Sequence, residues 1–550
     1  MQINLVFSPF AMPCAPLGIA GIKSYVEKNS DFHVKCLDWN VIYQNALDDD
    51  IRNNKGNIKM SEHDRSTFLE AVDVFKAGNE DFFNQAVYDR SVVTVFVDCF
   101  KMLNGFFSKE CRKALYENKH IPWFVQECVE FLLLNKADVV GFSIMFPEQI
   151  FFSLLAARML KTADRNIKIV FGGHSSSAAY KDILTQQFID FVVLNEGEKA
   201  FLDLLSALNG DKELGQVPNL AFNSDGKVTV TESSLITNLD DTPFPDFSDF
   251  DLSRYFAPEP VLPILGSRGC YWRRCAFCVH YKSYLNKYRT ASVKRVVDEL
   301  QYHVDNGVKY FDFVDEMIPS ARFKQIGEEI VRRGLQVYYY GLAKPTSDFT
   351  NDVLDVMYES GCRYIIWGVE SGCQRILDLM DKGTNVKDIS RVLEDSALAG
   401  IKNHVYVMVA FPSETKEELW ETLEFLYENR DNIHVIHKGR FNLHKGSLVY
   451  ENPEKFYITK MYAPDFSCGG EVKYDVSQGI KQDDAELYRV FYTKNYFHCF
   501  NYFSDCLSIL RHHALLLYSN HDKLTFNLAR KAVPLPVEIG LPPQLSSAGY

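Results

Sequence analysis

Short apolar runs alternate with amphipathic helical stretches along most of the chain, in two separate series. The first series has buried-strand patterns at residues 3–7, 34–39, 137–143, 167–171 and 191–194. Apolar runs of this length, separated by helices, predict parallel strands that are covered by helices on both faces. We therefore expect an α/β domain of Rossmann-like type over residues 1–222, with a helical insertion at about 46–135 where the alternation stops.

The second series begins at residue 262. Its strand patterns lie at 262–265, 310–314, 336–342, 364–369, 403–410 and 433–436. Six repeats of strand and helix predict a (β/α)6 partial barrel of TIM type over residues 262–450. Residues 223–261, which contain Pro243, Pro245 and an acidic run, are expected to form a linker. Residues 451–550 are rich in Tyr and Phe and are expected to be mainly helical.

Composition and charge limit the classes of function. The chain has 59 Lys and Arg against 72 Asp and Glu, a net charge of −13, which disfavours binding to nucleic acid or anionic membranes. No apolar run approaches the ~18–20 residues of a membrane-spanning helix, and the amino terminus lacks the pattern of a secretion signal. We therefore expect a cytoplasmic protein without membrane contact, in which the 13 cysteines stay reduced.

Three cysteines form a tight group directly after the first barrel strand: Cys270, Cys275 and Cys278. Three thiolates on one loop fill three corners of a [4Fe–4S] cluster and leave one iron open. Nearby arginines are expected to favour the thiolate form, namely Arg268, Arg273 and Arg274. Two alternatives remain: a structural zinc site, which needs a fourth ligand such as His280, and a group of metal-free thiols.

This cysteine group, placed in a six-repeat barrel behind an α/β domain, resembles the cobalamin-binding radical S-adenosylmethionine (SAM) enzymes. The resemblance covers about residues 1–450. It implies a [4Fe–4S] cluster on the three cysteines, SAM on the open iron, and cobalamin in the first domain. The family separates its first two cysteines by three residues, whereas four residues separate Cys270 from Cys275, and we expect a loop bulge to absorb the extra residue.

The resemblance also implies SAM contacts at the ends of barrel strands: Phe277, Glu316, Lys344, Glu370 and Ser371. Glu316 stands where the family places a carboxylate near the SAM ammonium, and Lys344 stands where relatives often carry an arginine that pairs with the SAM carboxylate. The alternatives are a solvated helix cap at Glu316, a surface lysine at Lys344 and a capping serine at Ser371. After the fifth strand, Ala410 and Ser413 replace the two glycines of the family's turn.

For cobalamin, the resemblance implies contacts from the strand ends of the first domain: Pro13, Ser143, Gly172, Gly173, His174, Glu196, Gly197 and Glu198. Better-known cobalamin modules ligate cobalt through a histidine of an Asp-x-His-x-x-Gly loop, but residues 8–14, at the corresponding place, contain no histidine. We therefore expect cobalamin to bind without a histidine from that loop, and we interpret His174 as a hydrogen-bond donor or a loop residue. The alternative is a doubly wound domain that binds another nucleotide or nothing, although no dinucleotide fingerprint or Walker loop is present.

The implied activity is radical methylation of an unactivated carbon in a natural-product or peptide substrate, with no side chain assigned as catalytic. One alternative is rearrangement or cyclisation without methyl transfer, and another is a non-catalytic zinc or iron–sulfur protein. A one-electron donor such as flavodoxin or ferredoxin is the implied protein partner. Tyr338, Tyr339 and Tyr340 are expected to pack against helices rather than to contact substrate. The aromatic runs at 488–492 and 496–500 are expected either to cap the barrel or to form an aromatic core.

Overall fold

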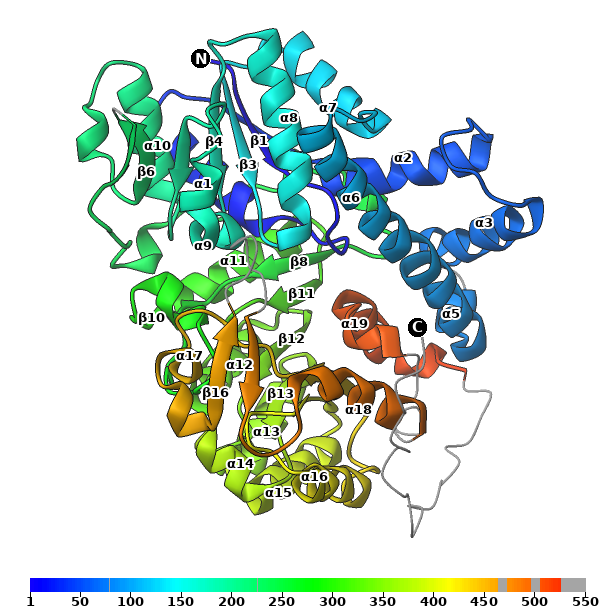
Figure 1. Cartoon of the computed structure of the whole chain (residues 1–550). Helices are drawn as coiled ribbons and strands as arrows, with labels where there is room; N and C mark the ends of the chain where they lie inside the picture. Colours follow the sequence, from blue (N-terminus) through cyan, green and yellow to red (C-terminus); the bar gives the residue numbers. More distant parts are fainter. Residues whose placement is uncertain (79, 225, 463–471, 496–504, 526–550) are drawn as a thin grey trace, which may run out of the picture.

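The computed structural model describes the chain except for residues 79, 225, 463–471, 496–504 and 526–550. Two α/β units lie one above the other, and a helical arm made of α2, α3, α5 and α6 extends to one side of them (Figure 1). Both units were expected from the sequence, and the order of a Rossmann-like domain followed by a partial barrel is confirmed.

The first unit is built on a seven-stranded sheet with the order β2-β1-β3-β4-β5-β6-β7. Its first five strands are parallel: β1 (Ile3–Phe7), β2 (Val34–Asp38), β3 (Val139–Ser143), β4 (Lys168–Gly172) and β5 (Phe191–Val193). Helices accompany these strands: α1 (Leu17–Asn29), α8 (Ile150–Ala163), α9 (His174–Ile183) and α10 (Glu198–Leu208). Each of the five strands overlaps a buried-strand pattern of the sequence.

Two antiparallel strands, β6 (Leu220–Ser224) and β7 (Lys227–Val230), extend this sheet at one edge. The sequence analysis did not predict them and placed most of this segment in the linker. All four residues of β7 are exposed, and the alternation of Val228 and Val230 with polar residues spans only four positions, the shortest length from which a strand is predicted. Short 3-10 turns occupy part of the remaining linker at Leu239–Asp241 and Leu252–Arg254.

The expected helical insertion is present between β2 and β3. It contains α2 (Trp39–Asn53), α3 (Glu62–Ala77), α4 (Glu80–Phe83), α5 (Gln85–Val92), a π-helical stretch (Val93–Lys101), α6 (Met102–Glu117) and α7 (Trp123–Leu134). Within the described residues, Gln85–Glu117 forms one continuous helix that is long and apolar enough to cross a membrane, and 39% of its most apolar window is buried. The sequence expectation concerned uninterrupted apolar runs, and polar residues such as Asp98 and Lys101 interrupt this helix. The helix meets the length and composition of a membrane span and no more, which is weak evidence for one. Val95, Phe96, Cys99 and Phe100 from this helix pack in the protein core.

The second unit is a six-stranded sheet with the order β8-β11-β12-β13-β14-β15. All of its strands are parallel: β8 (Val261–Ile264), β11 (Tyr310–Phe313), β12 (Tyr338–Ala343), β13 (Cys362–Glu370), β14 (Lys402–Val409) and β15 (Val435–Arg440). Helices cover its outer face: α11 (Val293–Asp305), α12 (Ser320–Arg333), α13 (Asn351–Glu359), α14 (Gln374–Leu379), α15 (Val386–Leu398) and α16 (Lys416–Glu428). The predicted (β/α)6 partial barrel is confirmed.

The two faces of the barrel sheet pack against different partners. Tyr339 belongs to the core cluster formed with α11, α12 and α13, and its hydroxyl lies 2.8 Å from Ser360 Oγ. Tyr340 points to the opposite, concave face and stacks on Tyr364 with ring centroids 4.4 Å apart. The expectation of packing against helices therefore holds for Tyr339, whereas Tyr340 faces the inside of the barrel.

The carboxy-terminal region contains a hairpin as well as helices. The hairpin pairs β16 (Ile458–Tyr462) with β17 (Lys473–Val476), and the helices are α17 (Leu448–Glu451), α18 (Gln482–Asn495) and α19 (Arg511–Ser519). Helix α19 contacts β11, β12 and β13 and lies between the barrel and the helical arm (Figure 1). The aromatic run at 496–500 lies outside the described residues.

Candidate active site between the two α/β units

The cysteine loop leaves β8 at the carboxyl edge of the barrel. Two short antiparallel strands, β9 (Ser267–Arg268) and β10 (Arg289–Thr290), close it at its base. Cys275 is 7% exposed, and Cys270 and Cys278 are half-buried. Between the first two cysteines the chain turns through Arg273 in a left-handed conformation, with φ of 54°.

The thiols are not gathered around a single point. Among the residues that the structure describes, no three His, Cys, Asp or Glu side chains converge closely enough to hold one metal ion. A mononuclear zinc site brings its ligands onto one ion, whereas a [4Fe–4S] cluster distributes its cysteines over different irons. Three thiols on one loop are the donor set of a [4Fe–4S] cluster with one open iron, whereas a structural zinc site normally has four ligands.

The cations that act on the Cys275 thiol are Lys382 and Lys344, not the three arginines expected from the sequence. Arg273 donates to the carbonyl of Asn286 at 2.7 Å, and Arg274 pairs with Asp381 at 2.9 Å. Burial raises the pKa of the Cys275 thiol, and the charge of Lys382 opposes that rise. Burial also raises the pKa of Cys278 to about 12, so this thiol releases its proton when metal binds.

Lys344, at the end of β12, is buried and not a surface lysine. Its Nζ atom lies 3.2 Å from the centroid of the Trp272 ring, and the indole of Trp272 donates to the carbonyl of Asp381 at 2.7 Å. Burial and the neighbouring Lys382 lower the pKa of Lys344 to about 8. In the described part of the chain no carboxylate lies within ion-pair distance of its ammonium, so Lys344 is available to a bound anion.

Two acidic residues follow β11 and have different environments. Asp315 is buried, accepts a hydrogen bond from the Gly266 amide at 2.9 Å and from the Ser267 hydroxyl, and thereby shapes the start of the cysteine loop. Glu316 is partly exposed and lies 3.2 Å from Nδ1 of His280. Helix α12 begins only at Ser320, after an N-cap at Pro319, so Glu316 is not the helix cap that was considered as an alternative.

At the end of β13, the neighbouring residues Glu370 and Ser371 make different kinds of contact. Glu370 adopts a left-handed conformation, with φ of 68°, and pairs with the buried Lys382 at 2.7 Å. Ser371 lies 3.0 Å from the Thr422 hydroxyl and accepts a hydrogen bond from the Cys373 amide at 3.1 Å. Ser371 therefore holds the turn before α14, but the N-cap of that helix is Cys373, so Ser371 is not the helix cap considered as an alternative.

In the turn after β14, two residues that are not glycine adopt the left-handed backbone conformation that favours glycine. Ala410 has φ of 60° and Ser413 has φ of 76°. Glu414 is completely buried in this turn and accepts a hydrogen bond from the Ala410 amide at 2.6 Å. Burial raises the pKa of Glu414 to about 8.

In the first unit, the strand order places a topological switch point between β1 and β3, where doubly wound sheets bind ligands. Ser143 and Gly172 are half-buried at this edge, and a side-chain carbon added at Gly172 would meet no atom within 4 Å. Met145 and Phe146 beside them are 51% and 45% exposed. Small residues beside exposed apolar side chains fit a large, partly apolar cofactor such as cobalamin.

The loop of residues 8–14, which follows β1, is held rigidly although it contains no histidine. The side chain of Asn40 accepts from the Ala11 amide at 3.0 Å, and Gln44 donates to the Ala11 carbonyl at 2.9 Å. Phe10 has φ of 79° and packs its ring edge-on against Tyr43. Pro13 is buried in the same loop.

The remaining residues expected near cobalamin lie at the junction of the two units. Gly173 has φ of 96°, and a side chain there would come within 2.5 Å of the Ile144 carbonyl oxygen, so the turn before α9 requires glycine. His174 is exposed and stacks on His280 of the cysteine loop, with ring centroids 5.7 Å apart. Gly197 precedes α10 and separates Glu196 from Glu198.

Both of these glutamates form ion pairs with the barrel unit. Arg268 of β9 pairs with Glu198 and also lies 3.3 Å from Glu196, and Arg289 of β10 pairs with Glu196. All four side chains are nearly buried. The sequence analysis assigned Arg268 to the thiols and did not single out Arg289, because nothing in a linear sequence indicates that these segments face each other.

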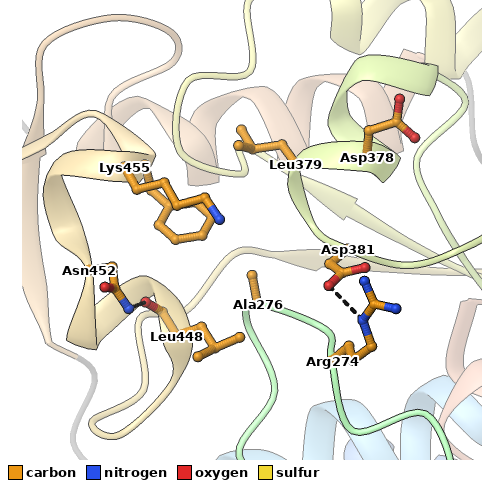
Figure 2. Close-up of a pocket in the computed structure, with 9 residues that line it drawn as sticks. Arg274, Ala276, Asp378, Leu379, Asp381, Leu448, Asn452 and Lys455 are labelled. Atoms are coloured by element: carbon orange, nitrogen blue, oxygen red, sulfur yellow. Dashed lines mark hydrogen bonds and ion pairs between the residues drawn. The ribbon is translucent and has the colours of Figure 1, made fainter.

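A cavity of about 440 Å³ adjoins the outer side of the cysteine loop (Figure 2). It lies between the loop, the end of α14 and the region of α17. Its walls are formed by Arg274, Ala276, Asp378, Leu379, Asp381, Leu448, Asn452, Lys455 and Phe456. Figure 2 shows the ion pair of Arg274 with Asp381 on one side of the cavity.

Comparison with known proteins identifies both units. Residues 264–426 match the radical SAM superfamily, and residues 101–205 match the B12 binding domain. An uncharacterised methyltransferase of Pyrococcus horikoshii is 28% identical over 294 residues, which cover 52% of this chain and 63% of the relative. The anaerobic magnesium-protoporphyrin IX monomethyl ester cyclase of Rubrivivax gelatinosus is 28% identical over 301 residues, covering 52% of this chain and 53% of the relative.

The chain thus spans less than two thirds of the length of these curated relatives. Among solved structures, the cobalamin-dependent S-adenosylmethionine radical enzyme OxsB with aqua-cobalamin bound has a TM-score of 0.65 at 16% identity. This match covers 90% of this chain and 67% of that structure, and it shows that the two units share its fold.

Proposed function

Because the chain belongs to the cobalamin-binding radical SAM family, we propose that it is a methyltransferase that acts on an unactivated carbon atom. The observation that carries the proposal is the position of the cysteine loop. The loop faces the strand ends of the B12 binding domain, and the pair formed by His174 and His280 joins the two. A methyl donor in one domain and a radical initiator in the other would then meet at one junction.

The three cysteines Cys270, Cys275 and Cys278 would hold the [4Fe–4S] cluster. Glu316 and Lys344 would bind the ammonium and the carboxylate of SAM, because they present opposite charges from neighbouring strands at the same edge of the barrel. Phe277, half-buried within the loop, and Glu370 complete the proposed SAM contacts. When bound, the cluster supplies one-electron cleavage of SAM, and cobalamin supplies a methyl group.

The chain's own residues orient these groups and exclude water. Lys382 neutralises Glu370 within the barrel wall, and Asp315 fixes the start of the cysteine loop. Ser371 supports the neighbouring turn through Thr422. We assign no side chain as a general base, because a radical reaction at an unactivated carbon has no acidic proton to remove.

Cobalamin would lie along the carboxyl edge of β1, β3 and β4. Ser143, Gly172 and Gly173 would let it approach the backbone, and Pro13 would shape the loop beneath it. Since residues 8–14 contain no histidine, we propose that the cofactor binds without a protein histidine from that loop. Glu196 and Glu198 would act on the site through the arginines that they hold, rather than by direct contact.

A second candidate function is radical cyclisation or rearrangement without methyl transfer. It is favoured by the sequence similarity to the Rubrivivax gelatinosus cyclase, which equals the similarity to the Pyrococcus horikoshii methyltransferase. In either case we propose a natural-product or peptide substrate and a flavodoxin or ferredoxin as electron donor. The described cysteines are free thiols, which supports a cytoplasmic location where thiols stay reduced.

Isotope-labelled turnover separates the two candidates. The protein, reconstituted without air and supplied with cobalamin, would be incubated with an extract of small molecules and SAM that carries a deuterated methyl group. For a methyltransferase we expect a product with the labelled methyl, together with equal amounts of 5′-deoxyadenosine and S-adenosylhomocysteine. A product that tracks 5′-deoxyadenosine alone would establish the cyclisation alternative, and product formation that tracks neither compound would contradict both.

A further inference from the structure

A second polar cluster lies inside the barrel, apart from the cysteine loop, where α19 meets the concave face of the sheet. The carbonyl of Arg511 accepts a hydrogen bond from the Tyr364 hydroxyl at 2.7 Å. The guanidinium of Arg511 donates to the hydroxyl of Tyr406. Nε2 of His512 lies 3.4 Å from a carboxylate oxygen of Asp312. The first turn of α19 is thus fixed inside the barrel with a cation pointing at the strands.

His404 on β14 is the unusual member of this cluster. It is 1% exposed, and neither of its ring nitrogens has a hydrogen-bond partner among the described residues. Its ring lies 5.2 Å from that of Tyr406, the residue that receives the guanidinium of Arg511. Burying an imidazole without hydrogen-bond partners destabilises the folded protein. The presence of such a residue therefore points to a bound ligand that accepts or donates a hydrogen bond at His404.

Arg511 and Asp312 bring opposite charges to this cluster. Burial and the nearby charges of His437 and Arg511 hold the pKa of His404 well below its usual range, so the imidazole is neutral and can donate one hydrogen bond. In the described part of the chain Arg511 forms no ion pair with a carboxylate. The amino-terminal end of α19 adds its helix dipole, and its first turn contains no acidic residue.

Exposure on the concave face rises toward the carboxyl ends of the strands. Tyr340 and Tyr364 are fully buried, whereas Leu342 and Met408, nearer the carboxyl ends of their strands, are half-buried. An apolar wall thus lies on the side of the cysteine loop, and the cationic group lies deeper in the barrel. A molecule that fills this face would place an apolar part near the loop and a charged end at Arg511.

We propose that Arg511, the first turn of α19 and His404 bind an anionic group, a carboxylate or a phosphate, at the end of the substrate remote from the reacting carbon. The guanidinium and the imidazole N–H would donate to its oxygens, and Leu342 and Met408 would contact the apolar part. The identification of this ligand as the substrate rests on the proposed function, whereas the anion site itself does not.

The site is tested on the full chain without cofactors, using three probes of the same shape: benzoate, phenyl phosphate and benzamide. We expect one or both anions to bind, detected by saturation-transfer NMR, and benzamide not to bind. Arg511→Gln should weaken anion binding by at least about tenfold, the loss expected for a charge-assisted pair of hydrogen bonds. Arg332→Gln, on the outer surface of α12, is the matched control and should leave binding unchanged. Equal binding of benzamide, or unchanged anion binding by Arg511→Gln, would overturn the proposal.

A second variant excludes a merely structural role for the cluster. His404→Leu removes the unpartnered imidazole while keeping its volume nearly constant. We expect weaker anion binding together with an unchanged or higher Tm, because no hydrogen bond within the described protein is lost. A lower Tm with unchanged anion binding would show that His404 serves packing alone.

Anion binding and SAM cleavage, measured on the same protein, test the anion site and the proposed enzymatic function separately. Wild-type protein that binds the anions but, after reconstitution, does not cleave SAM would refute the enzymatic function and leave the site standing. Protein that cleaves SAM but binds neither anion would refute the site alone.

Discussion

Replacing Glu414 by Gln should stabilise the barrel at neutral pH. Glu414 is wholly buried in the turn after β14, and burial raises its pKa from 4.5 to about 8. The folded protein therefore keeps this proton up to about pH 8, whereas the unfolded chain releases it near pH 4.5. Consequently the contribution of Glu414 to the free energy of unfolding is fully present below pH 4.5 and is lost as the pH rises to about 8.

The two pKa values set the magnitude. At pH 7 the difference costs the folded state about 3 kcal/mol, and at pH 5 it costs about 1 kcal/mol. A glutamine keeps an oxygen that accepts the hydrogen bond of the Ala410 amide, and it does not ionise. In the wild-type protein the second carboxyl oxygen of Glu414 has no hydrogen-bond partner among the described residues. In the variant the side-chain NH2 group of glutamine takes this position, and burying it without a partner costs about 1 kcal/mol. We therefore expect Glu414→Gln to gain about 2 kcal/mol at pH 7 and nothing at pH 5.

Urea unfolding at both pH values measures this difference, and hydrogen exchange of peptides from β13, β14 and β15 assigns it to the barrel. Glu428→Gln, at an exposed position of the adjoining α16, is the control and should change stability by less than about 0.5 kcal/mol. A Glu414→Gln variant that is destabilised at pH 7, or whose gain is the same at both pH values, would refute the argument from burial.

The remaining predictions concern the cysteine loop. Replacing Cys270, Cys275 and Cys278 together by Ala should abolish iron–sulfur absorption and SAM cleavage after anaerobic reconstitution; stoichiometric zinc without iron in the wild-type protein would contradict the cluster. Gly383→Ala should lower stability by about 1–3 kcal/mol and reduce the iron content, because the added carbon overlaps the ring of Trp272 and Gly383 has φ of 66°. Thermal unfolding and iron analysis check this variant, and a normal Tm with full iron would show that Trp272 can move aside without consequence.

The parts of the structure that depend on local pattern were predictable from the sequence. All six barrel strands and the five parallel strands of the first sheet have apolar runs long enough to mark them. Strand β7 has no such run, because it is only four residues long and alternates valine with polar residues. The cysteine group was recognisable for a different reason: its residue types and spacing have few other uses in a reduced protein.

The surroundings of the site could not be predicted, because they depend on which segments meet in space. Lys344 is indistinguishable from a surface lysine until Trp272 covers it. Ser371 matches a family motif, but its hydroxyl is committed to Thr422, a residue 51 positions away. Arg511 lies in a segment with no motif, and only the packing of α19 inside the barrel places it beside Tyr406.

The ion pairs between the two units explain how their sites stay in register. Arg268 and Arg289 lie at the two ends of the segment that contains all three cysteines, and both pair with glutamates that directly precede or begin α10. The cysteine loop is therefore anchored at both ends to the domain that binds B12. Because these charges are nearly buried, removing Arg268 leaves Glu198 without its ion-pair partner, at a cost of about 3–5 kcal/mol. A movement of the B12 binding domain relative to the barrel would have to break these ion pairs or carry the cysteine loop with it, so the junction ties the loop to both units.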